Sequence, residues 1–223
     1  MNTYKTFINY LIKKQKINHS DIITLLGKNN ITPQDITSEM QSWYIGLGIT
    51  EVTKRPFALS PCPFTSEEIN LIEERNEIII CIPKEITALE LSKLFRIDSW
   101  AVHDLLVDLK TEKKDIWLKT SADPTPKFLG VTGIDIKNTI EDNNWIPFSL
   151  TYYMVFIARY RYLFNKNPDQ RYWIWLSKGR YDRSGMLIAG FDNNDQFNVH
   201  GWMPHFSANF LGARYLETSI ASK

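Results

Sequence analysis

Apolar residues recur every three or four positions along much of the chain, which is the spacing of one face of an α-helix. The pattern predicts short helices over 4–14, 20–27, 32–43, 65–75, 87–95, 99–109 and 135–142. Two of these helices also carry start signals, because Thr32 is followed by Pro33 and Asp35, and Thr65 or Ser66 precedes two glutamates. The first three helices are expected to form a small bundle.

Other apolar runs alternate with polar residues or extend over only a few positions, which is typical of β-strands. They predict strands over 77–82, 116–119, 172–176, 186–191 and 197–200. The run from Ile78 to Ile82 contains only Ile and Cys, so we expect it to be buried on both faces. Asp192–Asp195 joins the last two strands. A hairpin turn is favoured there over a calcium loop, which would need a glycine and a closing glutamate.

The longest apolar stretch predicts a central helix over 146–164. Its first part, from Ile146 to Ala158, is almost wholly apolar, as expected for a helix that is buried on all sides. Helices dominate the start of the chain and strands its end, which predicts an α+β fold. We expect an N-terminal helical segment at 1–45, and then a mixed domain at 64–223 in which the central helix packs on a mainly antiparallel sheet.

The net charge of the 223-residue chain is +1, so no overall field attracts a polyanion or a membrane surface. The charge is nevertheless uneven along the chain. Residues 1–62 have a net charge of +3 and residues 151–223 have +4, whereas residues 63–150 have −6. A polyanion site is therefore expected at the two ends of the chain rather than in its middle.

One segment of the acidic middle part resembles a helix-turn-helix. Within 90–105, apolar anchors fall at the positions that such a motif needs: Leu91, Ile97, Val102 and Leu105. The order of elements over 64–120 also looks like a winged helix. In those families the second helix enters the major groove. The resemblance implies three residues that read base edges: Ser99, Trp100 and His103.

Two features of this segment depart from the pattern. Arg96 stands in the turn where many such motifs have glycine, and residues 64–120 contain 8 Lys and Arg against 12 Asp and Glu. Phosphate neutralisation supplies most non-specific affinity for nucleic acid, so an acidic reading segment is disfavoured. Ordinary helix packing or a protein contact is the alternative use of this segment.

A second candidate for nucleic-acid binding is the basic and aromatic run at 159–183, where Tyr and Trp could stack on bases and Arg could bind phosphates. In the alternative, the arginines at the end of the central helix meet its dipole, and Trp173 and Trp175 pack in the core. The remaining candidates for an anion or ligand site then lie in a loop around Gly179 and in the hairpin that follows it: Lys178, Arg180, Arg183 and His200.

The sequence contains no recognised catalytic or metal-binding signature. Cys62 and Cys81 make no disulfide framework, His200 and His205 lack further metal ligands, and no phosphate loop or nucleophile elbow occurs. We therefore expect no catalytic residues, no metal and no cofactor. An enzyme whose site is assembled from distant residues is a third possibility, with Arg180, Arg183, Asp192 and His200 as the place to look.

The leading interpretation is a non-enzymatic protein-interaction module that binds a protein partner or a second copy of itself, because aromatic-rich surfaces suit protein interfaces. The alternative is a nucleic-acid-binding protein. The sequence has no run of 18 apolar residues, so we expect no membrane-spanning helix. Lysines also interrupt every apolar run in the first residues of the sequence, unlike in a signal peptide, so we expect a cytoplasmic protein without a membrane partner.

Overall fold

The computed structural model describes residues 31–104, 107, 110–181 and 185–219. Its α-helices are α3 (Pro33–Gly46), α4 (Ile49–Thr53), α5 (Ser66–Glu74), α6 (Ala88–Phe95), α7 (Gly133–Asp142) and α8 (Leu150–Phe164). Its strands are β1 (Glu77–Ile82), β2 (Ile116–Ser121), β3 (Ile146–Pro147), β4 (Trp173–Tyr181), β5 (Gly185–Phe191), β6 (Phe197–Trp202), β7 (Leu211–Ala213) and β8 (Tyr215–Leu216). The α+β class is confirmed, while the helices expected at 4–14 and 20–27 lie outside the described residues.

Three helices begin with the same motif, a capping box. A threonine hydroxyl accepts a hydrogen bond from a backbone N–H three residues later, and the acidic side chain there accepts one from the threonine N–H. The pairs are Thr32 with Asp35 for α3, Thr65 with Glu68 for α5, and Thr87 with Glu90 for α6. The expected start at Thr32 is confirmed, and Thr65 rather than Ser66 caps α5.

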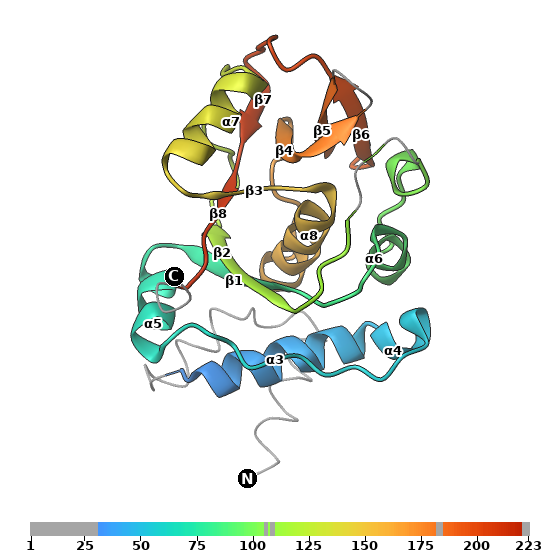
Figure 1. Ribbon diagram of the computed structural model, residues 1–223, viewed down its shortest axis with the longest axis vertical. Helices are drawn as coiled ribbons and strands as arrows, with labels where there is room; N and C mark the ends of the chain where they lie inside the picture. Colours follow the sequence, from blue (N-terminus) through green and yellow to red (C-terminus); the bar gives the residue numbers. More distant parts are fainter. Residues whose placement is uncertain (1–30, 105–106, 108–109, 182–184, 220–223) are drawn as a thin grey trace.

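The largest sheet has four strands in the order β6-β5-β4-β7. Strands β4, β5 and β6 are antiparallel neighbours, and β7 pairs with β4 in parallel. Two small antiparallel pairs, β1 with β2 and β3 with β8, lie below this sheet in Figure 1. The sheet is therefore mainly antiparallel, as predicted.

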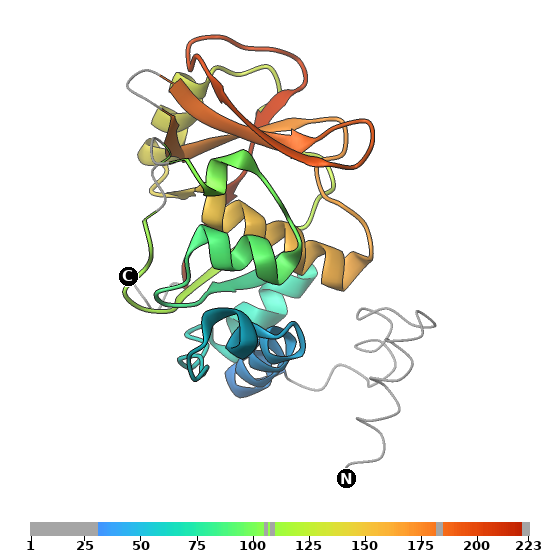
Figure 2. The ribbon, with the colours of Figure 1, turned by 90° about the vertical axis from the view of Figure 1, so that its right-hand side faces the viewer.

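Helix α8 lies at the centre of the molecule, between the four-stranded sheet on one side and β1 and α6 on the other (Figures 1 and 2). All of its residues from Leu150 to Ile157 are buried, as are Arg159 and Tyr160. A helix that is apolar all round can be stable only when neighbours cover every face. The prediction of a buried central helix is confirmed.

The other face of the four-stranded sheet is covered by α7. Ile136 and Ile140 of this helix join Trp175, Met186 and Ile188 of the sheet in a second apolar cluster. The sheet thus separates two cores, a large one around α8 and a small one under α7. It presents alternate side chains to each, as the period of two along a strand requires.

Helix α3 packs against the large core. Met40, Trp43 and Tyr44 belong to that core, and the Tyr44 hydroxyl donates a hydrogen bond of 2.7 Å to the Cys81 carbonyl oxygen of β1. The guanidinium of Arg159 on α8 donates two hydrogen bonds, of 2.7 and 2.6 Å, to the Glu39 carboxylate of α3.

Two expected elements differ from the structure. The helix predicted over 99–109 is wrong, because the described residues contain only a 3-10 turn at Trp100–Val102, after which His103 and Asp104 are not helical. The central helix begins at Leu150 rather than Ile146, because Ile146 and Pro147 pair with β8 and the Ser149 hydroxyl caps the helix.

The hairpin turn at Asp192–Asp195 is confirmed by hydrogen bonds from the N–H groups of Asn194 and Gln196 to the Asp192 carboxylate. Among the described residues, no helix is both long enough and apolar enough to cross a membrane.

Candidate functional site

Lys178 lies in an irregular part of β4, where the pairing with β5 shifts register between Leu176 and Arg180. Its ammonium group lies 3.1 Å from a carboxylate oxygen of Glu112 and 3.0 Å from the hydroxyl oxygen of Tyr152. The Tyr152 hydroxyl donates a short hydrogen bond to the same Glu112 oxygen. The bulge in β4 thus brings together a cation, a phenol and a carboxylate from three separate elements.

The electrostatics of this cluster favour fixed charges rather than proton transfer. Partial burial raises the pKa of Glu112, but hydrogen bonds from Tyr152 and Lys178 and the charge of Lys178 outweigh burial, so the pKa lies below its usual value. Burial and the neighbouring Glu112 carboxylate both raise the pKa of Tyr152, which keeps the phenol protonated as a donor. The cluster therefore connects β4 to the start of α8 and to the 110–115 loop.

The other predicted anion-site residues do not gather around Lys178. Arg180 is exposed and pairs with Met186 across β4 and β5, and Arg183 lies outside the described residues. His200 is exposed on β6, opposite Ile188, with its ring 5.0 Å from that of Trp173. Since Ile188 faces the small core under α7 and Lys178 contacts α8, His200 and Lys178 lie on opposite sides of the sheet.

The three predicted base-reading residues are not displayed on a helix. The Ser99 hydroxyl is buried and caps the 3-10 turn, accepting a hydrogen bond of 3.3 Å from the Ala101 N–H. The Trp100 indole N–H donates a hydrogen bond of 2.6 Å to the Val199 carbonyl oxygen of β6. His103 is exposed but ends the turn. Residues 99–104 pack on the sheet around a 3-10 turn, so this described part does not form the second helix that a helix-turn-helix places in the major groove.

A buried ion pair between Asp169 and Arg214 is the most extensive polar network that the sequence did not indicate. The two side chains lie 2.6 Å apart and are almost inaccessible to water. Asp169 also accepts a hydrogen bond of 2.9 Å from the Tyr153 hydroxyl, and Arg214 donates to the carbonyl oxygens of Ser121 and Asp123. Full satisfaction and lack of access are typical of a structural network rather than a site. No local sequence signal marks either residue.

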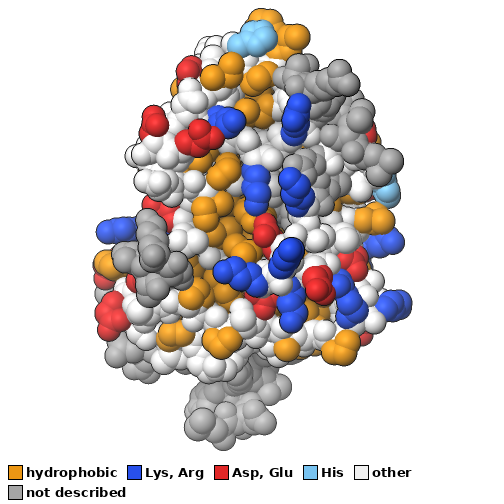
Figure 3. All heavy atoms as spheres, in the orientation of Figure 1, with side chains coloured by type: hydrophobic (Ala, Val, Ile, Leu, Met, Phe, Trp, Pro, Cys, Tyr) orange, Lys and Arg blue, Asp and Glu red, His pale blue; other side chains and the backbone are white. Residues whose placement is uncertain are grey.

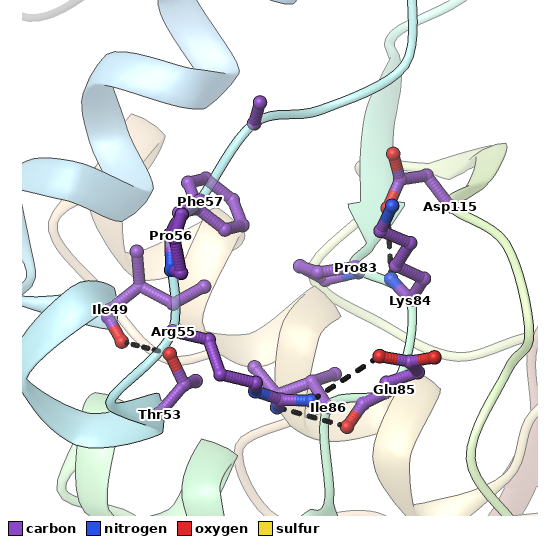
Figure 4. A pocket seen from close by; sticks show the side chains of 11 residues that line it. Ile49, Thr53, Arg55, Pro56, Phe57, Pro83, Lys84, Glu85, Ile86 and Asp115 are labelled. Atoms are coloured by element: carbon purple, nitrogen blue, oxygen red, sulfur yellow. Dashed lines mark hydrogen bonds and ion pairs between the residues drawn. The ribbon is translucent and has the colours of Figure 1, made fainter.

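Figure 4 shows a small pocket between α4, the segment after it and the loop at Pro83–Ile86. Its volume is about 60 Å³, room for about two water molecules. Its polar groups already have partners: Arg55 pairs with Glu85 and Glu90, and both carboxylate oxygens of Asp115 accept backbone hydrogen bonds. Within the described part of the chain, no three His, Cys, Asp or Glu residues are placed to hold a metal ion.

Exposed apolar side chains gather at one end of the molecule. Six of the eleven large hydrophobic residues that are exposed in the described ranges come from two segments, with 40% to 53% of their surface accessible: Leu129, Ile134, Trp202, Met203, Phe206 and Phe210. We call these six residues the apolar end. The Ile134 N–H donates to the Pro204 carbonyl oxygen and the Gly130 N–H donates to Leu211, so the two segments lie side by side. Figure 3 shows hydrophobic side chains, next to a histidine, at the top of the molecule.

These clusters differ in what they leave open to a partner. Asp169 and Arg214 are buried, and the groups of the Lys178 cluster are bound to one another, whereas the apolar end is exposed to solvent. The sequence does not indicate the apolar end because four of its residues lie in loops without a periodic pattern, and Ile134 and Trp202 lie at the ends of α7 and β6. No protein-family model matches the sequence, and it has no match among the curated proteins or the solved structures.

Proposed function

We propose that this protein is a protein-interaction module that binds its partner through the apolar end. The supporting observation is the concentration of exposed Trp, Phe, Met, Leu and Ile side chains on two adjacent segments, at 129–134 and 202–210. Scattered exposed hydrophobic residues are normal on a protein, but a contiguous group of them marks an interaction site.

The composition of the apolar end fits the centre of an interface. Aromatic residues and Met are enriched in interface cores, and a few of them carry most of the binding energy. Polar groups surround them: Asp135 and Lys137 follow Ile134 on α7, and the exposed His205 precedes Phe206. An apolar centre with a polar rim lets a partner exclude water from the aromatic side chains while the rim stays solvated.

The backbone that carries these side chains is held in place. The Phe206 N–H donates to the Met203 carbonyl oxygen at 3.1 Å, the Leu211 N–H donates to Ala208 at 2.8 Å, and the Trp173 N–H of β4 donates to Phe210 at 2.8 Å. A preorganised surface loses less conformational entropy on binding than a loose loop. The loop is therefore built as a binding surface rather than as a linker.

The test is a comparison of Phe206→Ser/Phe210→Ser with the control Ile45→Ser/Leu71→Ser, whose side chains are 48% and 44% exposed but lie on α3 and α5. Partners are first identified by crosslinking in cell extract and are then purified. Binding is measured by calorimetry for each partner, and self-association is measured by analytical ultracentrifugation.

We expect the Phe206/Phe210 variant to weaken binding of a partner, or of a second copy, by at least about 30-fold, the effect of losing a hot spot of about 2 kcal/mol. The control variant should bind as the wild type does. The proposal fails if both variants bind equally, or if the wild type binds neither a protein nor itself. Binding to lipid vesicles that only the Phe206/Phe210 variant loses would instead make the apolar end a membrane contact.

A further inference from the structure

Lys and Arg side chains gather down the middle of the face shown in Figure 3. Three segments that are distant in the sequence, and that contact one another through Glu85, Glu112 and Lys178, carry six exposed cations. We call them the basic band: Lys84, Lys110, Lys113, Lys114, Lys178 and Arg180. Four of them come from the part of the chain that is acidic overall, so the charge of the sequence segment does not predict the charge of this surface.

Backbone and side-chain contacts join the three segments. The Glu85 N–H donates a hydrogen bond of 2.7 Å to the Glu112 carbonyl oxygen, which holds the loop after β1 beside the loop before β2. The Lys178 ammonium then bonds to the Glu112 side chain at 3.1 Å, which holds β4 against the same loop. Glu112 is thus the point at which the three segments meet.

The carboxylates within the band are engaged by the protein itself. Asp115 accepts hydrogen bonds from the backbone N–H groups of Ser60 at 2.6 Å and Lys84 at 2.8 Å, and Glu112 accepts from Tyr152 and Lys178. Glu85 pairs with Arg55, which lies outside the band. Within the described segments 84–85, 110–115 and 178–180, six cations stand against three carboxylates, those of Glu85, Glu112 and Asp115.

We propose that the basic band binds the phosphate backbone of duplex nucleic acid, without reading its sequence. A band of cations spread over three segments matches a row of phosphates better than a single small anion, which would need a pocket lined with converging donors. Proteins that hold single strands stack bases on exposed aromatic rings. Among the described side chains of the band, the aromatic ring is that of Tyr152, which is buried beneath the Lys178 ammonium at 4.4 Å, so a duplex fits better than a stacked single strand.

Binding of this kind has a defined dependence on salt. Neutralising about four phosphates releases condensed counterions and gives a slope of about −3.6 for the logarithm of the association constant against the logarithm of salt concentration. The affinity should therefore fall by about 100-fold between 50 and 200 mM salt. This surface is distinct from the apolar end, and the inference does not depend on the proposed protein partner.

The experiment measures fluorescence anisotropy of a labelled 20-base-pair DNA duplex with the full chain, at several salt concentrations. The test variant is Lys113→Gln/Lys114→Gln, which removes two adjacent exposed cations. The control is Lys137→Gln/Lys166→Gln, which removes the same charge from exposed residues on α7 and after the far end of α8. Helix α8 has 15 residues, so about 22 Å separates its two ends.

We expect the test variant to weaken duplex binding at least about 5-fold and to reduce the salt slope by about 1 to 2. The control should bind as the wild type does, and circular dichroism should show that both variants are folded. The inference is overturned if the wild type does not bind at 50 mM salt, or if both variants lose affinity equally. It is also overturned if a single strand, or a poly-glutamate peptide of equal charge, binds more tightly than the duplex.

Discussion

At the scale of single residues, two buried or partly buried ion pairs of this protein join partners that are far apart in the sequence. Asp169 and Arg214 are 45 residues apart, and Glu112 and Lys178 are 66 residues apart. Each pair is surrounded by further donors or acceptors, which offset part of the cost of removing a charge from water. The stability of the fold at different pH values therefore depends on a small number of such clusters.

Replacement of Tyr152 by Phe should destabilise the protein in a way that depends on pH. Partial burial raises the pKa of Glu112, but the hydrogen bonds from Tyr152 and Lys178 and the charge of Lys178 have the larger effect, so the pKa lies below its usual value. Such a carboxylate stabilises the folded state at pH values above about 4.3, its pKa in the unfolded chain. This stabilisation is lost as the pH falls through the lower pKa of the folded state. We expect Tyr152→Phe to lower the free energy of unfolding by about 1 kcal/mol at pH 7, and by less at pH 3, in urea titrations.

The matched control for this prediction is Tyr172→Phe. Within the described residues, the Tyr172 hydroxyl has no hydrogen bond. Its removal should therefore change stability little, and equally at both pH values. A loss in Tyr152→Phe that is constant from pH 7 to pH 3 would show that Glu112 is not the acceptor that matters.

Single residues were also the least predictable level from the sequence. Lys178 is one of the predicted anion-site residues, but no pattern in the sequence indicates its partners Glu112 and Tyr152, because neither belongs to the same local segment. Trp100 was expected to face a ligand, yet its indole bonds to Val199 across 99 residues of chain. Sequence patterns report local geometry, and these contacts are decided by tertiary packing.

At the scale of secondary structure, the sequence was far more informative. The bounds of β1 agree with the prediction, Thr32 caps α3 as predicted, and Thr65, one of the two predicted candidates, caps α5. Both signals depend on neighbours within four residues, so they survive in any tertiary context. The helix expected over 99–109 failed because its apolar periodicity is also satisfied by a short turn packed on β6.

Strand pairing makes one glycine indispensable. A Cβ atom at Gly190 of β5 would lie 2.6 Å from the Tyr172 carbonyl oxygen and 3.2 Å from the Trp173 ring. Backbone atoms cannot move aside as a flexible side chain can, so β5 would have to shift away from β4. We expect Gly190→Ala to lower the free energy of unfolding by about 2 to 3 kcal/mol in chemical denaturation.

Gly46, in the last turn of α3, provides the control for this prediction. A Cβ atom there would have no neighbour within 4 Å, and an alanine favours the helix. Gly46→Ala should be neutral or stabilising by up to about 1 kcal/mol. If the two substitutions had the same effect, close packing at β5 would not be the cause.

At the scale of the whole molecule, the division into a helical segment at 1–45 and a domain at 64–223 remains a prediction, but α3 is firmly attached. Its residues share the core with β1 and α8, and Arg159 of α8 is 5% exposed while bonded to Glu39 of α3. The Arg159 guanidinium also lies over the Trp43 ring, at 5.6 Å from its centre. These contacts couple the unfolding of α3 to that of the large core.

Arg159→Met should test this coupling. Removal of the guanidinium deletes its two hydrogen bonds to the Glu39 carboxylate, so we expect a loss of about 2 kcal/mol in the free energy of unfolding. In hydrogen exchange, amides of α3 and β5 should lose protection together. Faster exchange confined to α3 would show that the helix unfolds separately.

The exposed pair of Lys137 and Glu141, 3.8 Å apart on α7, gives the comparison. Surface pairs contribute between about 0 and 1 kcal/mol. Lys137→Met should therefore leave both stability and exchange almost unchanged. A loss as large as that of Arg159→Met would mean that charge removal itself, rather than the contact with α3, is responsible.

The Asp169–Arg214 pair has a consequence for the order in which the protein can form during its synthesis. A chain emerges N-terminus first, and Arg214 follows Asp169 by 45 residues, or roughly 2 to 9 seconds of translation. During that interval Asp169 has no cation to accompany it into the interior, so the segment between α8 and β4 cannot close over the nascent core. Closure must wait for Arg214, which lies between β7 and β8, so the contacts of Asp169 are completed only late in synthesis.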